Sequence, residues 1–300
     1  MYTPRAINVM SACDSLACAQ NRQFALQRFS VKIWRYAVVG GVSICTSSSP
    51  RTPRVPIEAL TFFIKNNYLG NNSISIDMLI GLIADVHSNV VALKAVLTAL
   101  DGIGVEKILH VGDIIGYNPY PNEAVELFIK YGIISILGNH DRALIENEYS
   151  GFNPYAAAAL EWTKNVISQE NIQYISRLND IASFEIIGRK IVIVHGSPRD
   201  FDEYVYPEDV VPGFISDADI LVLGHTHVQF MKEYPEGIIV NPGSVGQPRD
   251  GNPDAAFAIL DTDSGKVKLM RTGYNIEKVI DDILAARLPE KLAFRLMVGF

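Results

Sequence analysis

The sequence predicts an α/β fold for residues 78–300. Three observations support this prediction. Short apolar runs, of the kind that are buried on both faces of a sheet, alternate with amphipathic segments of helical spacing. Five of the runs end directly at polar side chains, and further strand-like runs follow them. Because ligands of open α/β sheets bind beyond the carboxyl ends of the strands, we expect the functional site where these runs end.

The composition limits the class of protein. Of the 300 residues, 48% are hydrophobic and 20% are charged, which is typical of a soluble globular protein and excludes a disordered or fibrous chain. No apolar stretch approaches the roughly 20 residues that a membrane-spanning helix needs. We therefore expect no membrane segment and, without a clear targeting signal, a cytoplasmic protein.

Residues 1–77 differ from the rest of the chain in charge and pattern. They hold 8 basic and 3 acidic side chains, which leaves 18 basic and 30 acidic side chains for residues 78–300. They show no sustained helical or strand period, so we expect an N-terminal extension rather than a folded domain. We favour a translation start at Met78, which makes the extension an upstream tail, over the alternative of an organelle targeting segment.

Five apolar runs form the first expected strands, and each stops at a side chain that can bind a metal. In chain order they are residues 79–84, 108–111, 133–137, 191–194 and 220–223. The carboxyl ends of such strands meet at one edge of a sheet, so their polar residues should converge on one rim.

Helices are expected between and after these strands. One begins at Val90 and is ended by Gly102, because apolar residues recur on a single face between them. The apolar residues of a second helix are Ile276, Val279, Ile280, Ile283 and Leu284.

Two further features are expected in the second half of the chain. Helices at 155–168 and 172–178 would form a small cap around residues 154–178 beside the site. Four strand-like runs predict a second sheet. These runs are residues 228–232, 237–240, 255–260 and 267–271.

The side chains at the strand ends favour metal chemistry. The three cysteines, Cys13, Cys18 and Cys45, all lie in the extension, so residues 78–300 contain no thiol. Of six histidines in the chain, five lie at the expected strand ends. Imidazole, carboxylate and carboxamide groups together suit Mn²⁺, Fe²⁺, Zn²⁺, Co²⁺ or Ni²⁺, whereas Mg²⁺ and Ca²⁺ prefer oxygen ligands.

The number of candidate ligands predicts two metal ions. Seven candidates exceed the three or four ligands of a single catalytic zinc site, so a bridging carboxylate is expected between two ions. Two ions about 3.5 to 4 Å apart can hold a hydroxide between them for attack on phosphorus. Hydrolysis of a phosphate ester is the expected reaction, with two Mn²⁺ ions as the expected cofactors.

The polar blocks also carry a resemblance to a known family. In chain order they are Asp85-x-His87, Gly112-Asp113, Gly138-Asn139-His140-Asp141, His195-Gly196, Gly224-His225-Thr226-His227 and Asn241-Pro242-Gly243-Ser244. This ordered set resembles the calcineurin-like metallophosphoesterase superfamily over nearly all of residues 78–273. The resemblance implies a four-layer α-β-β-α sandwich, in which two mixed sheets are flanked by helices.

The resemblance implies a role for each motif residue. Asp113 would bridge the two metals. The other ligands would be Asp85, His87 and His227 for the first metal, and Asn139, His195 and His225 for the second. His140 would lie over the substrate phosphate, next to Asn139, and would stabilise the transition state or protonate the leaving oxygen, with a pKa near neutral.

Two other segments are similar to a narrower group of proteins. Residues 116–122 and 241–249 are similar to compact prokaryotic phosphoesterases related to diadenosine tetraphosphatases. Arg249 is the predicted phosphate contact, because a guanidinium binds phosphate oxygens in a bidentate way, and Arg199 is the second candidate. Tyr117 either contacts the substrate by stacking on a base or packs within its own loop.

Structural roles are expected for three other residues. His110 should be buried and hydrogen-bonded near the site rather than a ligand. Asp141 either caps a helix or orients a ligand. Ser244 lacks the G-x-S-x-G frame of a nucleophile and should support a turn.

Three functions are consistent with these residues. The leading hypothesis is a dinuclear metal-dependent phosphoesterase that acts on a small phosphate ester or nucleotide; monoester, diester and dinucleoside polyphosphate all remain open. A catalytically silent scaffold or regulatory protein would lack ligands, and none is missing. A nuclease is opposed by the net charge of −12 on residues 78–300, because binding to long nucleic acids depends on clustered Lys and Arg.

Overall fold

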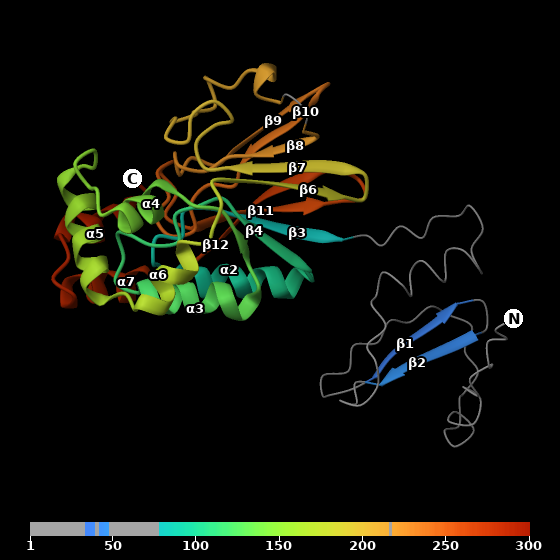
Figure 1. Ribbon diagram of the computed structural model, residues 1–300, viewed down its shortest axis with the longest axis horizontal. Helices are drawn as coiled ribbons and strands as arrows, with labels where there is room; N and C mark the ends of the chain where they lie inside the picture. Colours follow the sequence, from blue (N-terminus) through green and yellow to red (C-terminus); the bar gives the residue numbers. More distant parts are fainter. Residues whose placement is uncertain (1–33, 40–41, 48–77, 216–217) are drawn as a thin grey trace, which may run out of the picture. The chain divides into compact units, whose positions relative to one another are not determined.

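The computed structural model describes residues 34–39, 42–47, 78–215 and 218–300 (Figure 1). The chain divides into two units, Met1–Ile74 and Ser75–Phe300. In the first unit, β1 (Trp34–Val39) pairs antiparallel with β2 (Val42–Ser47). This pair of strands was not predicted. The predictions for the remainder of the extension concern residues outside the described part of the chain.

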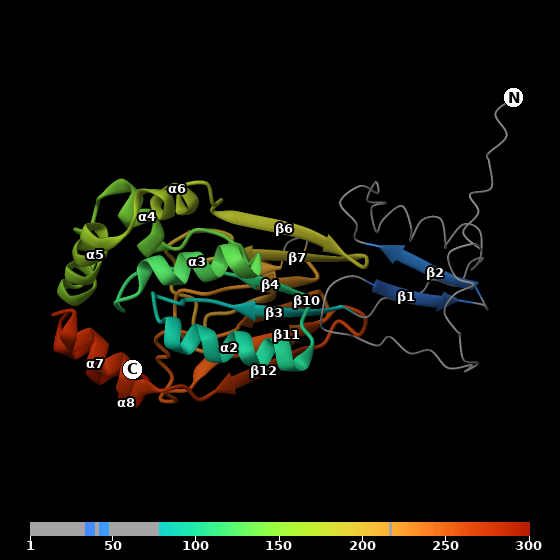
Figure 2. The ribbon, with the colours of Figure 1, turned by 90° about the horizontal axis from the view of Figure 1, so that it is seen from below.

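The second unit contains two mixed five-stranded sheets, as predicted (Figures 1 and 2). Sheet 1 has the strand order β12 (Val267–Thr272), β11 (Ala255–Asp261), β3 (Leu79–Ile83), β4 (Lys107–His110) and β5 (Ile134–Ser135). Sheet 2 has the order β6 (Ile181–Ile186), β7 (Arg189–Val194), β8 (Ile220–Val222), β10 (Gly237–Asn241) and β9 (Phe230–Tyr234). A shared core of buried aliphatic side chains, including Leu82, Leu109, Ile193 and Val222, packs the sheets against each other.

The strands that follow His225 and His227 do not form a sheet of their own. β9 and β10 extend sheet 2 beside β8, whereas β11 and β12 cross to sheet 1 and pair antiparallel beside β3. The expectation of a single rim is therefore corrected. Three of the five polar strand ends belong to the parallel strands β3, β4 and β5, and two belong to the parallel strands β7 and β8. The site forms where these two rims adjoin.

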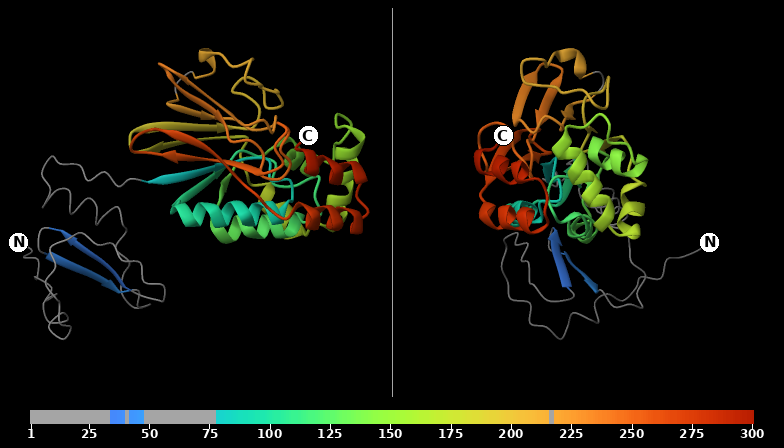
Figure 3. Two further views of the ribbon diagram at one scale, coloured as in Figure 1. Left: turned by 180° about the vertical axis from the view of Figure 1, so that it is seen from behind. Right: turned by 90° about the vertical axis from the view of Figure 1, so that its left-hand side faces the viewer.

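Two of the helices lie along sheet 1, and most of the others gather toward one end of the strands (Figures 2 and 3). The helices are α2 (Val90–Ile103), α3 (Pro121–Tyr131), α4 (Asn139–Glu146), α5 (Pro154–Val166), α6 (Gln169–Ile175), α7 (Ile276–Ala285) and α8 (Glu290–Val298). A second core lies between this sheet and α2 and α3, and it includes Leu93, Phe128 and Phe257. The predicted helices at 155–168 and 172–178 correspond to α5 and α6.

Helix α2 ends later than predicted, at Gly104 rather than Gly102. Gly104 has φ 88°, and its N–H donates to the carbonyls of Leu100 and Asp101. A left-handed residue of this kind ends a helix and favours glycine, whereas Gly102 keeps helical geometry.

The outer face of sheet 2 is covered by the segment that follows β7. Val205, Val210 and Phe214 of this segment pack on Leu221 and Ile239 of the sheet. Among the described residues, no helix has the length and apolar character needed to cross a membrane.

Candidate metal centre

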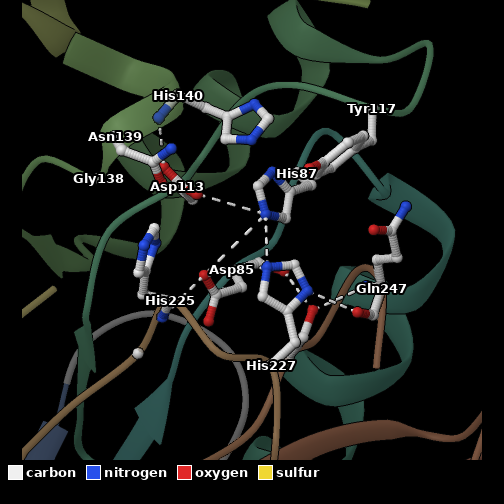
Figure 4. A network of polar contacts seen from close by, with 12 residues as sticks. Asp85, His87, Asp113, Tyr117, Gly138, Asn139, His140, His225, His227 and Gln247 are labelled. Carbon is white, nitrogen blue, oxygen red and sulfur yellow. Dashed lines mark hydrogen bonds and ion pairs between the residues drawn. The ribbon is translucent and has the colours of Figure 1, made fainter. Parts of the chain in front are cut away.

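Buried polar side chains converge where the strands of both sheets end (Figure 4). Asp85 and His87 follow β3, Asp113 follows β4, and all three are at most 1% exposed. His195 follows β7 directly, and His225 and His227 follow β8. Asn139 is the first residue of α4. All seven predicted ligands therefore lie around one point of the fold.

Five of these seven residues have a left-handed backbone. The residues are Asp85 (φ 52°), His87 (46°), Asp113 (64°), His225 (67°) and His227 (61°). This conformation costs on the order of 1 kcal/mol for a residue other than glycine, and it persists only where the surrounding structure enforces it. Clusters of such residues are typical of functional sites.

The first group of ligand atoms comes from Asp85, His87, Asp113 and His227, and these atoms all lie within 4.8 Å of one another. His87 Nε2 lies 3.4 Å from Asp113 Oδ2 and 3.1 Å from His227 Nε2. His227 Nε2 lies 3.5 Å from Asp85 Oδ1. Neighbouring ligands of a metal with bonds of about 2.1 Å are separated by about 3.0 to 3.4 Å, so the spacing suits a metal ion.

The second group consists of Asp113, His195 and His225, joined by Asn139. His195 Nε2 lies 3.5 Å from Asp113 Oδ2, 3.0 Å from Asn139 Oδ1 and 3.1 Å from His225 Nδ1. Asp113 Oδ2 therefore faces both groups, while Asp113 Oδ1 accepts the backbone N–H of His140 at 2.8 Å. One carboxylate oxygen is shared between two sets of ligand atoms.

Backbone carbonyls fix the orientation of three histidines. The Nδ1 atoms of His87, His195 and His227 lie 3.1, 2.8 and 2.6 Å from the carbonyls of Ile115, Val111 and Gln247. A proton on each Nδ1 is required for these bonds, so the Nε2 atom of each ring is directed into the site. The Nε2 atoms of His87 and His227 then present two lone pairs to each other, an arrangement that a cation between them would stabilise.

The charge states of the histidines also suit metal binding. Burial holds the pKa of His87 and His227 well below the usual value and lowers that of His225 to about 3, so these three rings are neutral, the form that binds metals. Burial also lowers the pKa of His195, but the adjacent Asp113 more than compensates and raises it to about 9. The ionised Asp113 carboxylate, 3.5 Å away, offsets the charge that this ring carries.

Asp85 also indicates that these residues suit a metal ion. Its Oδ2 atom is buried and has no hydrogen-bond partner among the described residues. Burial, reinforced by Asp113, raises the pKa of Asp85 to about 8. A buried, unpaired carboxylate oxygen is unfavourable unless a cation binds it. Both groups of residues could therefore hold a divalent metal ion.

A cavity of about 360 Å³ opens beside these groups, and Asp113, Asn139, His225 and His227 line its inner end. His140 also lines it and is 3% exposed. Burial lowers the pKa of His140 to about 4, below the near-neutral value that was expected. At neutral pH this ring is therefore uncharged and can donate a hydrogen bond.

Arg249 lines the same cavity, whereas Arg199 does not. The Nη2 atom of Arg249 donates to Tyr117 Oη at 3.1 Å and to Gln247 Oε1 at 3.2 Å. Arg199 instead forms an ion pair with Glu203, outside the cavity. The structure thus brings the first predicted phosphate contact to the site and leaves the second one away from it.

Tyr117 is buried beside the metal ligands. Its ring lies 4.6 Å from that of His87 and 4.6 Å from that of His140, and the residue is 3% exposed. Little of the ring is free to stack on a base. Of its two expected roles, this geometry favours packing, together with the hydrogen bond that holds Arg249.

The three residues with expected structural roles lie just outside the ligand groups. His110 is buried and its Nδ1 lies 2.7 Å from Ser135 Oγ, as predicted. Asp141 accepts the backbone N–H groups of Gly138, Asp113, Ile114 and Ile115, so it holds the Asp113 turn against the start of α4. Ser244 donates to the Asp85 carbonyl and supports that turn.

Three other residues of the site were not predicted. Gln247 holds His227 through its carbonyl and Arg249 through its side chain. Phe152 and Tyr204 line the cavity, in the α4–α5 connection and in the segment after β7. Gln247 lies within residues 241–249, which were singled out for their similarity to other phosphoesterases. No local pattern marks Phe152 and Tyr204, because their roles depend on where two connections fold.

Comparisons with known proteins agree with this geometry. Residues 78–265 match the model of the calcineurin-like phosphoesterase superfamily domain. An uncharacterized protein of Methanocaldococcus jannaschii is 37% identical over 239 residues, which cover 74% of this chain and 98% of that protein. A phosphodiesterase of the same organism is 25% identical over 189 residues, or 62% of this chain and 94% of that protein.

A solved structure is similar as well. The crystal structure of a metallophosphoesterase from Sphaerobacter thermophilus aligns with a TM-score of 0.63 and 36% identity, and the alignment covers 74% of this chain and 99% of that one. The ordered motifs, the two-sheet fold and the paired groups of ligands are those expected of a phosphoric ester hydrolase. The chain belongs to the calcineurin-like phosphoesterase superfamily.

Proposed function

We propose that the chain is a dinuclear metal-dependent phosphoesterase that hydrolyses a small phosphate ester. The observation that carries this proposal is the position of Asp113 Oδ2, which lies 3.4 Å from His87 Nε2 and 3.5 Å from His195 Nε2. An oxygen shared in this way suits a carboxylate that bridges two ions. Asp85, His87 and His227 would complete one metal site, and Asn139, His195 and His225 the other.

The residues of the chain have separate tasks in the proposed reaction. When bound, two divalent cations would lower the pKa of an attacking water and neutralise charge on the phosphate. Arg249 binds a phosphate oxygen, and Tyr117 and Gln247 hold its guanidinium in place. A water oxygen bonds to phosphorus and loses a proton, and the bond from phosphorus to the alcohol oxygen breaks. The neutral His140 ring donates a hydrogen bond to the leaving oxygen, which gains the proton that the water lost and departs as the alcohol.

A phosphodiester is the first substrate class to test, because two of the relatives are named phosphodiesterases. Mn²⁺ is the first metal to test, since a mixed set of imidazole, carboxylate and carboxamide ligands suits it. A catalytically silent scaffold is disfavoured because all seven ligands are present and grouped.

Metal removal tests the proposal directly. Chelator treatment of the full chain is expected to abolish turnover of an aryl phosphodiester, because the attacking water then has its ordinary pKa. Reloading with Mn²⁺ should restore turnover with two metal equivalents per chain, measured by elemental analysis and nitrophenol release. Undiminished turnover by the stripped protein, or saturation at one metal equivalent, would contradict the dinuclear proposal.

Substitution of Arg249 tests the phosphate contact. Arg249→Ala is expected to lower kcat/KM by about 10- to 100-fold, since a hydrogen bond to a charged group contributes roughly 1.5 to 3 kcal/mol. Tyr117→Phe removes only the hydroxyl that holds Arg249, so its effect should be about tenfold or less. Arg199→Ala is the matched control and should retain wild-type kinetics. Equal kinetics for the Arg249 and Arg199 variants would rule out a role for Arg249 in phosphate binding.

A further inference from the structure

The cavity continues outward from the metal ligands into a part with a different lining. Phe152, in the α4–α5 connection, lies edge-on to His140 with ring centroids 4.9 Å apart. Tyr204, in the segment after β7, lies against His225 with ring centroids 4.0 Å apart and is 51% exposed. These two connections flank the strand ends in Figure 1, and both aromatic rings line the cavity. An ester group that extends outward from the phosphate would contact these rings.

The outer part of the cavity carries negative charge. Glu146, Glu148 and Asp202 line the cavity, and all three are exposed, which places them toward its opening. Arg142 lines it as well, but its guanidinium pairs with Asp180 at 2.9 Å and stacks 3.3 Å over the Phe201 ring. Three carboxylates thus line this part of the cavity together with one arginine that already has a partner.

Both glutamates are exposed. The Ser150 N–H donates to Glu148 at 2.7 Å. Hydrogen bonds from Ser150 also hold the pKa of Glu148 below its usual value, so this side chain is ionised at neutral pH. The outer part of the cavity therefore presents a carboxylate that is charged under physiological conditions.

The inner part of the cavity has the opposite character. Arg249 lies there, beside the two groups of metal ligands. His225 is 4% exposed and lines the cavity. Its Nε2 atom is buried without a hydrogen-bond partner among the described residues, so it can bond to a polar group of a bound molecule. With the proposed metals bound, the cavity would thus have a cationic inner end for phosphate and an acidic, aromatic outer end.

We propose that the outer part of the cavity is a subsite for an ester group that carries a positive charge, such as a quaternary or primary ammonium. Aromatic faces and carboxylates together recognise cations. A second phosphate or a carboxylate in the same place would be repelled by Glu146 and Glu148. This inference rests on the proposed phosphoesterase function, and it disfavours dinucleoside polyphosphates, which the sequence alone leaves open.

Three matched esters test the subsite. They are p-nitrophenyl phosphodiesters whose second alcohol is choline, its uncharged analogue neohexyl alcohol, or glycolate. With the Mn²⁺-loaded full chain, kcat/KM should decrease in that order, with about a tenfold difference between the choline and glycolate esters, because each exposed cation–π contact or ion pair contributes modestly. Equal values, or a reversed order, would overturn the proposal.

Substitutions in the cavity test whether its residues cause the preference for the choline ester. The double variant Glu146→Gln and Glu148→Gln should bring the choline-to-neohexyl ratio of kcat/KM close to one, and Tyr204→Leu should lower it. Glu126→Gln removes one carboxylate charge from the exposed face of α3, outside the cavity, and should keep the wild-type ratio. An unchanged ratio in the double variant would refute the subsite.

Binding measurements separate this inference from the proposed function. Calorimetry with the phosphate monoesters of the same three alcohols measures the order of affinity whether or not the ester is cleaved. Absence of turnover with all three diesters by a protein that holds two metals would reject the phosphoesterase proposal, and the order of affinities would still support or reject the subsite.

Discussion

Asp113→Asn is expected to abolish turnover and to reduce metal binding below two ions per chain. The substitution keeps the size of the side chain but removes the charge of the one oxygen that faces both groups of ligands. Because each ion contributes several kcal/mol to stabilisation of the transition state, kcat/KM should fall by at least about 10³-fold. Turnover of an aryl phosphodiester and metal content after dialysis measure the two effects.

Asp281→Asn is the matched control for this variant. Asp281 is an exposed carboxylate on α7, so its neutralisation should leave kinetics and metal content unchanged. Circular dichroism should show that both variants remain folded. A variant without the Asp113 charge that still bound two ions and turned over normally would remove the basis for a bridging carboxylate.

Gly138→Ala is expected to have the second-largest effect, although residue 138 offers no ligand. Gly138 lies so close to the Asp113 turn that a Cβ atom would overlap Asp113 N and Oδ1. The backbone or the carboxylate must therefore move, and overpacking of this kind costs roughly 1 to 3 kcal/mol of stability. A displacement of the bridging group by about 1 Å should lower kcat by about 10²-fold, with a lower Tm.

Gly102→Ala provides the contrast. A Cβ atom at Gly102 meets nothing within 4 Å, and the residue lies in α2. Alanine is the better helix former, so this variant should be more stable by about 0.5 to 1 kcal/mol and fully active. If Gly138→Ala had the activity and Tm of the wild-type protein, the close approach of Gly138 to Asp113 would have no functional importance.

The sequence predicted elements whose signals are local. The runs that become β3, β7 and β8 stand out because apolar residues give way abruptly to polar ones. β6 (Ile181–Ile186) was not predicted, since its side chains alternate between half-buried and exposed and form no apolar run. The crossing of β11 and β12 to sheet 1 depends on contacts between distant segments, which no local pattern encodes.

The site was also predicted in part: its ligands were identified, but the backbone conformation that positions them was not. The ligand types and their order are visible in the sequence, so Asp113 and the histidines could be identified from the amino-acid pattern alone. The left-handed backbone at Asp85 and His225 could not, because both residue types usually adopt other conformations. The outer cavity was missed for a related reason, since Phe152 and Tyr204 reach it only through the paths of two irregular connections.

The ligands of each proposed metal come from both sheets, and this origin has a mechanical consequence. Asp85 and Asp113 follow strands of sheet 1, whereas His195, His225 and His227 follow strands of sheet 2. Strand hydrogen bonds hold each sheet together internally, and side-chain packing joins one sheet to the other. The proposed metals would therefore link the two sheets at the end of the sandwich where their ligands lie. The thickness of the core that the two sheets share would set the distance that the metals span, and bound metals would oppose sliding of one sheet over the other.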